Sequence, residues 1–122
     1  MARILVAEDG PDIRALLEHI FLSDGHDVAT AADGVEALER YAQGSFDLIC
    51  SDLEMPRLDG IELTRAVRAD TADDVPILMV SGSASADDLR DARAAGISDF
   101  LAKPFTLSDL REHVHALVPR PR

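Results

Sequence analysis

The chain has 122 residues and a formal net charge of −11, with 47% apolar residues but only 4% aromatic ones. This length suits one domain with a core of aliphatic side chains, and the charge argues against direct binding to nucleic acid or to an anionic membrane surface. We find no apolar run as long as a membrane span or a signal-peptide core. The single cysteine, Cys50, excludes an internal disulfide and suits a reducing compartment, so we expect a buried thiol in a cytoplasmic protein.

Short apolar runs alternate with segments of helical periodicity along the chain. Strands are predicted at 4–7, 28–31, 48–50, 77–80 and 100–102. Helices are predicted between and after them, at about 11–23, 34–44, 60–67, 86–96 and 107–117, with Ser85 and Thr106 as capping residues. This alternation favours one α/β domain over 1–122, a parallel sheet with helices on both faces. We expect residues 119–122 to form a tail or the stub of a linker.

The most informative stretch is 46–56, where a short apolar run ends abruptly at Asp52. A carboxylate at the end of a buried strand is costly unless its charge is needed there. Ligands of open α/β sheets bind outside the carboxyl ends of the strands. Asp52 is therefore the first candidate for chemistry, and a helix-capping role is the alternative.

Other polar side chains follow the ends of the remaining strands. In a parallel sheet these ends share one edge, and a strand order of 2-1-3-4-5 would place the first and third strands side by side there. The edge would receive Glu8 and Asp9, Asp52, Ser81 and Lys103, the only lysine of the chain. Each has an ordinary explanation alone, such as a helix-dipole acid, a loop hydroxyl or a surface charge. Their coincidence at one edge favours a functional site.

Three carboxylates this close repel, so that either a proton or a cation is needed among them. Few, solvent-open oxygen ligands suit Mg²⁺, which also binds phosphate oxygens. Lys103 and Ser81 add donors for an anion. The set is typical of phosphoryl transfer, with Asp52 as the nucleophile that forms an aspartyl phosphate.

These motifs resemble the receiver domain of two-component response regulators, of the single-domain chemotaxis type. The resemblance rests on Glu8-Asp9, on the stretch from Asp52 to Gly60, on Ser81 and on Lys103-Pro104-Phe105, and it covers essentially the whole chain. It implies a flavodoxin-like, doubly wound, five-stranded parallel sheet with five helices. The order 2-1-3-4-5 is itself a known property of chemotaxis receivers and is taken from the family.

The resemblance also assigns roles. Asp52 would accept a phosphoryl group from a histidine kinase or a histidine phosphotransfer protein, and Lys103 would pair with that group. Asp9, Asp52 and the backbone carbonyl of Glu54 would hold Mg²⁺, with Glu8 assisting through water. The peptide bond between Lys103 and Pro104 is expected to be cis.

The implied switch consists of Ser81, which would move toward the phosphoryl group, and Phe100, which would turn inward. The last two helices and the strand between them would then bind a downstream effector protein or output domain. Phe100 is often Tyr in the family, so we expect a weaker switch or one already biased inward. Structures of both states with Phe100 exposed before activation and buried after it would contradict this. By the same resemblance, Glu54 and Ser83 flank the site at the positions that in the family influence how long the phosphate lasts.

Three alternatives remain. A phosphate-independent interaction module of the same fold would have the same strands and helices. A phosphohydrolase with an aspartyl nucleophile is weakly suggested by Asp52-Leu53-Glu54, but such enzymes usually have Asp two residues on, and we expect no enzyme beyond self-catalysed phosphorylation and dephosphorylation. A flavin-binding protein is disfavoured because the chain has few aromatic residues.

The four histidines show no metal spacing and are expected on the surface.

Overall fold

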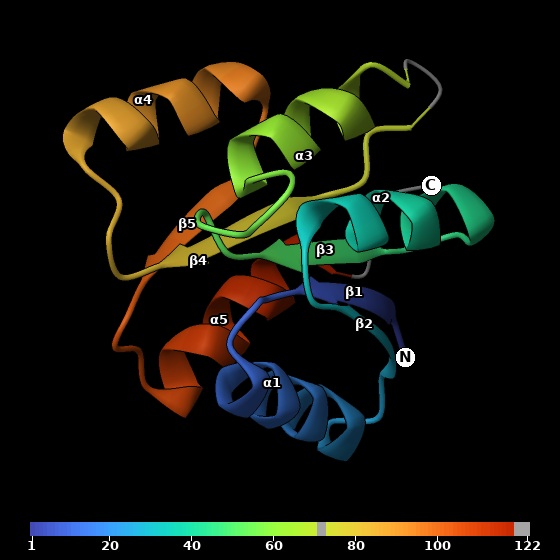
Figure 1. Ribbon diagram of the computed structural model, residues 1–122. Helices are drawn as coiled ribbons and strands as arrows, with labels where there is room; N and C mark the ends of the chain where they lie inside the picture. The colour runs from blue at the N-terminus through green and yellow to red at the C-terminus, as the bar shows by residue number, and fades with distance from the viewer. Residues whose placement is uncertain (71–72, 119–122) are drawn as a thin grey trace.

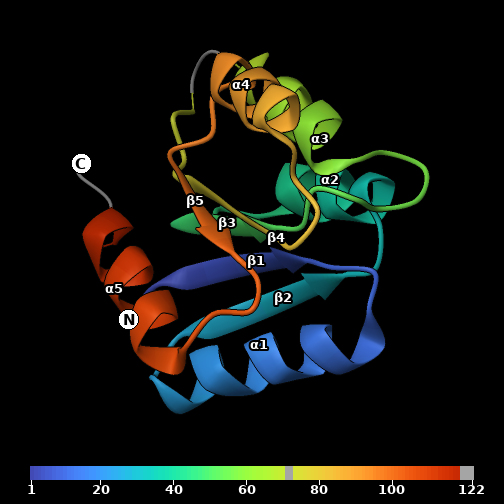
Figure 2. The ribbon, with the colours of Figure 1, turned by 90° about the vertical axis from the view of Figure 1, so that its left-hand side faces the viewer.

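The five strands form one parallel sheet in the order β2-β1-β3-β4-β5, as predicted. The computed structural model describes residues 1–70 and 73–118, so the expected tail at 119–122 lies outside the described residues. Helices α1 and α5 cover one face of the sheet and α2, α3 and α4 the other (Figures 1 and 2). The elements are β1 (Arg3–Ala7), α1 (Pro11–Ser23), β2 (Asp27–Ala31), α2 (Gly34–Gln43), β3 (Leu48–Ser51), α3 (Gly60–Arg68), β4 (Ile77–Ser81), α4 (Ala86–Ala95), β5 (Asp99–Ala102) and α5 (Leu107–Leu117).

The sheet is buried on both faces, which explains why its strands appear in the sequence as continuous apolar runs. Along β1, Ile4 and Val6 pack toward α1 and α5, whereas Leu5 and Ala7 pack toward α2 and α3. Cys50 lies in the first of these two cores, as expected, and burial raises the pKa of its thiol to about 12. A structural thiol of this kind is inert.

Local sequence signals position the helices just beyond the strand ends. The side chains of Asp33, Asp59, Ser85 and Thr106 each accept a backbone N–H of the following first turn. The predicted cap at Ser85 is confirmed, and it forms a capping box with Asp88. Helix α4 ends at Gly96, whose φ of 115° suits glycine. These caps belong to the chain itself, and this explains why the sequence predicted the helix starts well.

One prediction about the histidines was wrong. His26 is half-buried, and its Nδ1 accepts a hydrogen bond of 3.0 Å from the backbone N–H of Ala2. Its ring also meets the ring of Phe21 edge-on. Burial lowers the pKa of His26. Because these partners come from the start of the chain and from α1, no local pattern could have shown them.

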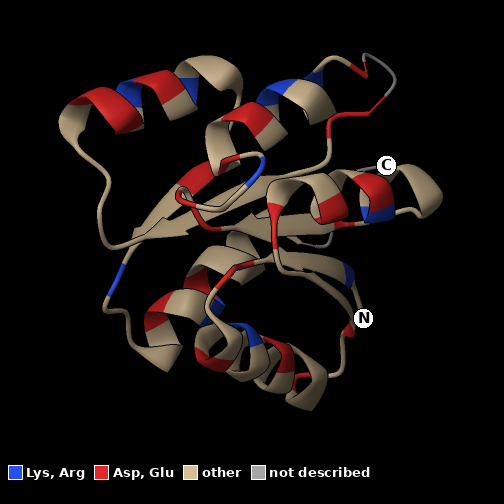
Figure 3. Cartoon of the chain, viewed as in Figure 1, with Lys and Arg blue, Asp and Glu red and all other residues tan. Residues whose placement is uncertain are grey.

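Acidic residues are spread over the helices of both layers (Figure 3). The net charge of −11 is therefore not gathered in one stripe. None of the helices in the described part of the chain combines the length and apolar character of a membrane span.

Candidate functional site

The site lies where β1 and β3, the two neighbouring central strands, reach their carboxyl ends. Ala7 pairs with Ser51 in the last register of these strands, so Glu8 and Asp52 follow at the same level. The backbone N–H of Asp52 donates to the carbonyl of Ala7 over 2.9 Å. This is the switch point of the doubly wound sheet, where the chain leaves β1 and β3 toward helices on opposite faces.

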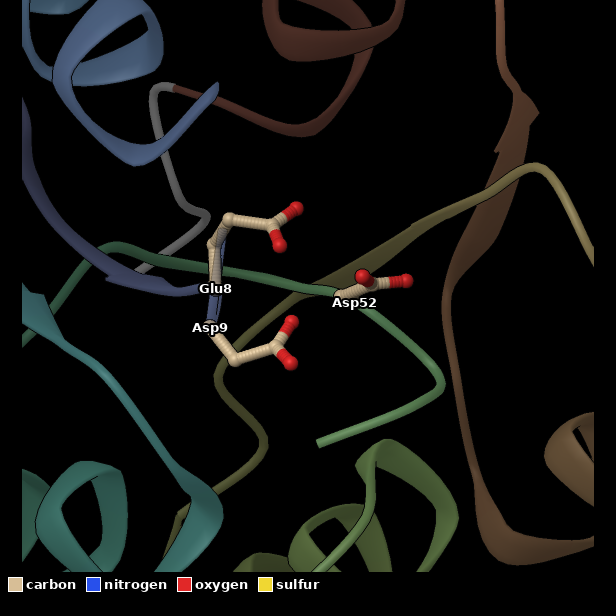
Figure 4. A group of neighbouring side chains, drawn as sticks. All are labelled: Glu8, Asp9 and Asp52. Carbon is tan, nitrogen blue, oxygen red and sulfur yellow. The ribbon is translucent and has the colours of Figure 1, made fainter. Parts of the chain in front are cut away.

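Three carboxylates meet at this point, as predicted. Glu8, Asp9 and Asp52 each offer an oxygen, and these oxygens lie within 4.8 Å of one another. Figure 4 shows the three side chains extending from the ends of β1 and β3 into one space. Glu8 is buried, Asp52 is intermediate and Asp9 is exposed, so the group opens to solvent on the side of Asp9.

Lys103 reaches the same space from the loop between β5 and α5. Its Nζ lies 2.8 Å from Glu8 Oε1 and 3.4 Å from Asp52 Oδ2. The backbone N–H of Lys103 donates to the carbonyl of Ser81 over 3.0 Å, which ties the ends of β4 and β5 together. The peptide bond between Lys103 and Pro104 is cis, as expected.

The pKa values follow from this crowding. Burial and the charge of Glu8 raise the pKa of Asp52 to about 6, although Lys103 opposes the shift. Burial alone would raise the pKa of Glu8, but the hydrogen bonds from Lys103 and from the Gly10 N–H bring it below its usual range. The pKa of Lys103 is raised, because its acidic partners outweigh the effect of burial. The surroundings therefore stabilise the negative charge of Glu8 more than that of Asp52.

The loop after Asp52 is held close to the strand end by the start of α3. Asp52 Oδ1 accepts the Leu53 N–H over 2.7 Å, and the Gly60 N–H donates to the Leu53 carbonyl over 2.8 Å. A Cβ atom at Gly60 would lie 2.2 Å from the Asp52 carbonyl oxygen, so only glycine permits this approach. Glu54 is exposed in this loop; the role of its carbonyl as a metal ligand stays a prediction.

The two predicted switch residues lie on β4 and β5. Ser81 is buried at the end of β4, and its Oγ accepts the Ser83 N–H over 3.2 Å. Phe100 is half-buried on β5 and packs against a small core that includes Met79 of β4 and Ala92 of α4. Ser81 ends β4 at the edge that carries the site, whereas Phe100 lies two residues before the end of β5. The movement of both on activation stays a prediction.

Arg14, on the first turn of α1, also contacts the site, although the sequence did not predict it there. Its Nη1 donates to the Glu8 carbonyl over 3.0 Å and lies 3.4 Å from the Asp9 carbonyl. The sequence did contain one signal for it. The first turn of a helix favours acidic residues, so an arginine there suggests that its charge has a partner elsewhere.

The arrangement is similar to known signalling domains. The family model of the response regulator receiver domain matches residues 4–115. The transcriptional regulatory protein PrrA of Mycobacterium tuberculosis is 42% identical over 118 residues, which are 97% of this chain and 50% of that protein. The response regulator MprA of Mycobacterium leprae is 40% identical over 97% of this chain and 51% of its own length. The chain thus spans about half the length of the curated relatives it matches.

Solved structures have the same fold. The chemotaxis protein CheY4 of Vibrio cholerae is 34% identical, with a TM-score of 0.91 over 97% of this chain and 99% of the other. The receiver domain of the sensor histidine kinase PA1611 from Pseudomonas aeruginosa is 32% identical, with a TM-score of 0.87 over 95% of this chain and 96% of the other. That structure has a magnesium ion coordinated in its active site cleft.

Proposed function

The chain belongs to the response regulator receiver family, and from that premise we propose that Asp52 is its phosphoacceptor. The observation that carries the proposal is the meeting of three carboxylates and Lys103 at the switch point of the sheet. Asp52 is the acid of this group that follows the central strand β3, and it is half-buried, whereas Glu8 is buried. Lys103, whose Nζ lies 3.4 Å from Asp52 Oδ2, would pair with an incoming phosphoryl oxygen.

The donor set fits Mg²⁺. Asp9 and Asp52, with the carbonyl of Glu54, would hold the ion, and Glu8 would act through water. Bound there, Mg²⁺ supplies charge neutralisation for carboxylate and phosphoryl oxygens. The raised pKa of Asp52 supports this assignment, because a carboxylate that is poorly compensated by Lys103 gains most from a cation.

The chemical step is a transfer between two covalent partners. A carboxylate oxygen of Asp52 forms a bond to phosphorus while the phosphorus–nitrogen bond of a phosphohistidine breaks, and the nitrogen that leaves takes up a proton from solvent water. We propose a histidine kinase or histidine phosphotransfer protein as the donor. The output would be binding of an effector protein or output domain to the face of α4, β5 and α5, with Ser81 and Phe100 as switch residues.

The test is phosphorylation of the wild type by a small acyl phosphate, read by intact mass. We expect a gain of one phosphoryl group with Mg²⁺ and none without it, and peptide mapping should place the group on Asp52. No gain under conditions that label a known receiver would contradict the proposal and favour the phosphate-independent module. Steady turnover of a phosphate ester would favour the phosphohydrolase.

The donor protein would also cover an apolar groove beside Lys103. The groove is lined by Ile13 and Leu16 of α1 and by Lys103, Pro104 and Phe105. Leu16 is 48% exposed although it is apolar. A helical domain that brings a phosphohistidine to Asp52 would bury this surface, because the groove adjoins the lysine of the site.

Leu16→Glu should therefore slow phosphotransfer from a histidine phosphotransfer domain that phosphorylates the wild type, by about tenfold, since a buried apolar contact becomes charged. Labelling by acyl phosphate should not change. Leu22→Glu is the matched control, because Leu22 is 52% exposed on the same helix but outside the groove. Equal transfer rates for the two variants would contradict the docking surface.

A further inference from the structure

We infer that Arg14 is a positioning residue, which orients Asp9 for metal binding; this rests on the proposed function. Arg14 contacts the backbone of the loop and not the carboxylates. Its Nη1 lies 3.0 Å from the carbonyl oxygen of Glu8 and 3.4 Å from that of Asp9. These carbonyls belong to the peptide groups on either side of the Asp9 Cα. Because each peptide group is planar, one guanidinium that bonds both restricts φ and ψ of Asp9 and thus the direction of its Cα–Cβ bond.

Asp9 needs such support more than its neighbours. The Glu8 N–H still bonds to the Ala31 carbonyl over 3.0 Å, and the Glu8 carboxylate is fixed by Lys103 and by the Gly10 N–H. Asp9 is exposed and lies beyond the end of β1. The residue before α1 is Gly10, which has no side chain to cap the helix. Arg14 thus bonds the two carbonyls that flank the Cα of Asp9, the least constrained acid of the site.

The positive charge of Arg14 would repel Mg²⁺, and this makes the inference testable. A cation on the first turn of α1 is unfavourable to the helix dipole and repels a second cation nearby. If Arg14 acted through charge alone, its removal would tighten Mg²⁺ binding. If it orients Asp9, its removal weakens Mg²⁺ binding. The two explanations predict changes of opposite sign.

The experiment measures Mg²⁺ affinity by calorimetry for the wild type, Arg14→Met and Arg14→Lys. We expect Arg14→Met to bind about tenfold more weakly, the usual scale for residues that support metal ligands. Arg14→Lys should lie between, because it has the charge but not the planar donor group. Arg40→Met, which removes the same charge from α2, should bind as the wild type does. Equal or tighter binding by Arg14→Met would overturn the inference.

A second measurement needs no metal. Amide hydrogen exchange at Asp9 and Gly10 should be faster in metal-free Arg14→Met than in the wild type or in Arg40→Met, with equal exchange in β1 as the check on folding. Unchanged loop exchange would also overturn the inference. If the wild type itself binds no Mg²⁺, the proposed function fails, and the exchange data still decide whether Arg14 orders the loop.

Discussion

Asp52→Asn is expected to take up no phosphoryl group from an acyl phosphate and, without Mg²⁺, to be more stable than the wild type above about pH 6. An amide is no nucleophile for this step, so phosphorylation is lost entirely. The gain in stability has a separate cause. Burial and the charge of Glu8 make the Asp52 carboxylate costly in the folded protein, which raises its pKa from 3.8 to about 6. Asparagine fills nearly the same volume without that charge.

The pH dependence follows from the direction of the shift. Between 3.8 and about 6 the folded protein binds a proton at Asp52 that the unfolded chain does not bind, so wild-type stability falls as pH rises through this window. The penalty is complete above about 6 and absent below 3.8. Its ceiling is about 3 kcal/mol, and we expect a gain of about 1 to 3 kcal/mol for Asp52→Asn near pH 8. The gain should vanish near pH 4.

Thermal unfolding at several pH values measures this gain. Asp91→Asn is the control, because it removes the same charge from an exposed position of α4 and reports general relief of the net charge. Mg²⁺ should stabilise the wild type and reduce or reverse the difference, since it binds the folded carboxylates. An equal gain in Asp91→Asn, or a gain that persists at low pH, would show that the charge of Asp52 does not destabilise the folded protein.

Gly60→Ala is expected to lower the free energy of unfolding by about 3 kcal/mol, at the upper end of the usual cost of overpacking. The new Cβ would lie 2.2 Å from the Asp52 carbonyl oxygen and 3.1 Å from the Leu53 Cα. Both are backbone atoms, so no side-chain rotation can relieve the contact. Either α3 or the loop after Asp52 must move, and phosphorylation by acyl phosphate should slow as well.

Urea unfolding of Gly60→Ala and Gly25→Ala separates a clash from backbone strain. Gly25 has a φ of +89°, and no atom of the described residues outside its immediate neighbours would lie within 4 Å of a Cβ there. Alanine at this position therefore costs about 1 to 2 kcal/mol through conformation alone. Phosphorylation should be unchanged in Gly25→Ala, because the residue follows α1 at the far end from the site. Equal losses of stability in the two variants would show that the approach of α3 to Asp52 is not tight.

The sequence predicted most of this site because its main residues follow strands. Parallel strands end at a shared edge, so Glu8, Asp52 and Lys103 had to come near one another once the strand order was known. The helix caps at Ser85 and Thr106 were also predictable, because each cap bonds to its own next turn. The family resemblance added the cis bond before Pro104, which the structure contains.

Local patterns by themselves thus determined the elements, their order along the chain and the chemical character of one edge. Only the tertiary structure decided which of these groups are in contact. It showed that Lys103 lies closer to Glu8 than to Asp52, that Arg14 contacts the backbone of the loop that carries Asp9 and that His26 is half-buried. These facts depend on distances between residues of different elements, to which hydrophobic periodicity and capping motifs are insensitive because they report only neighbours within a turn or a strand.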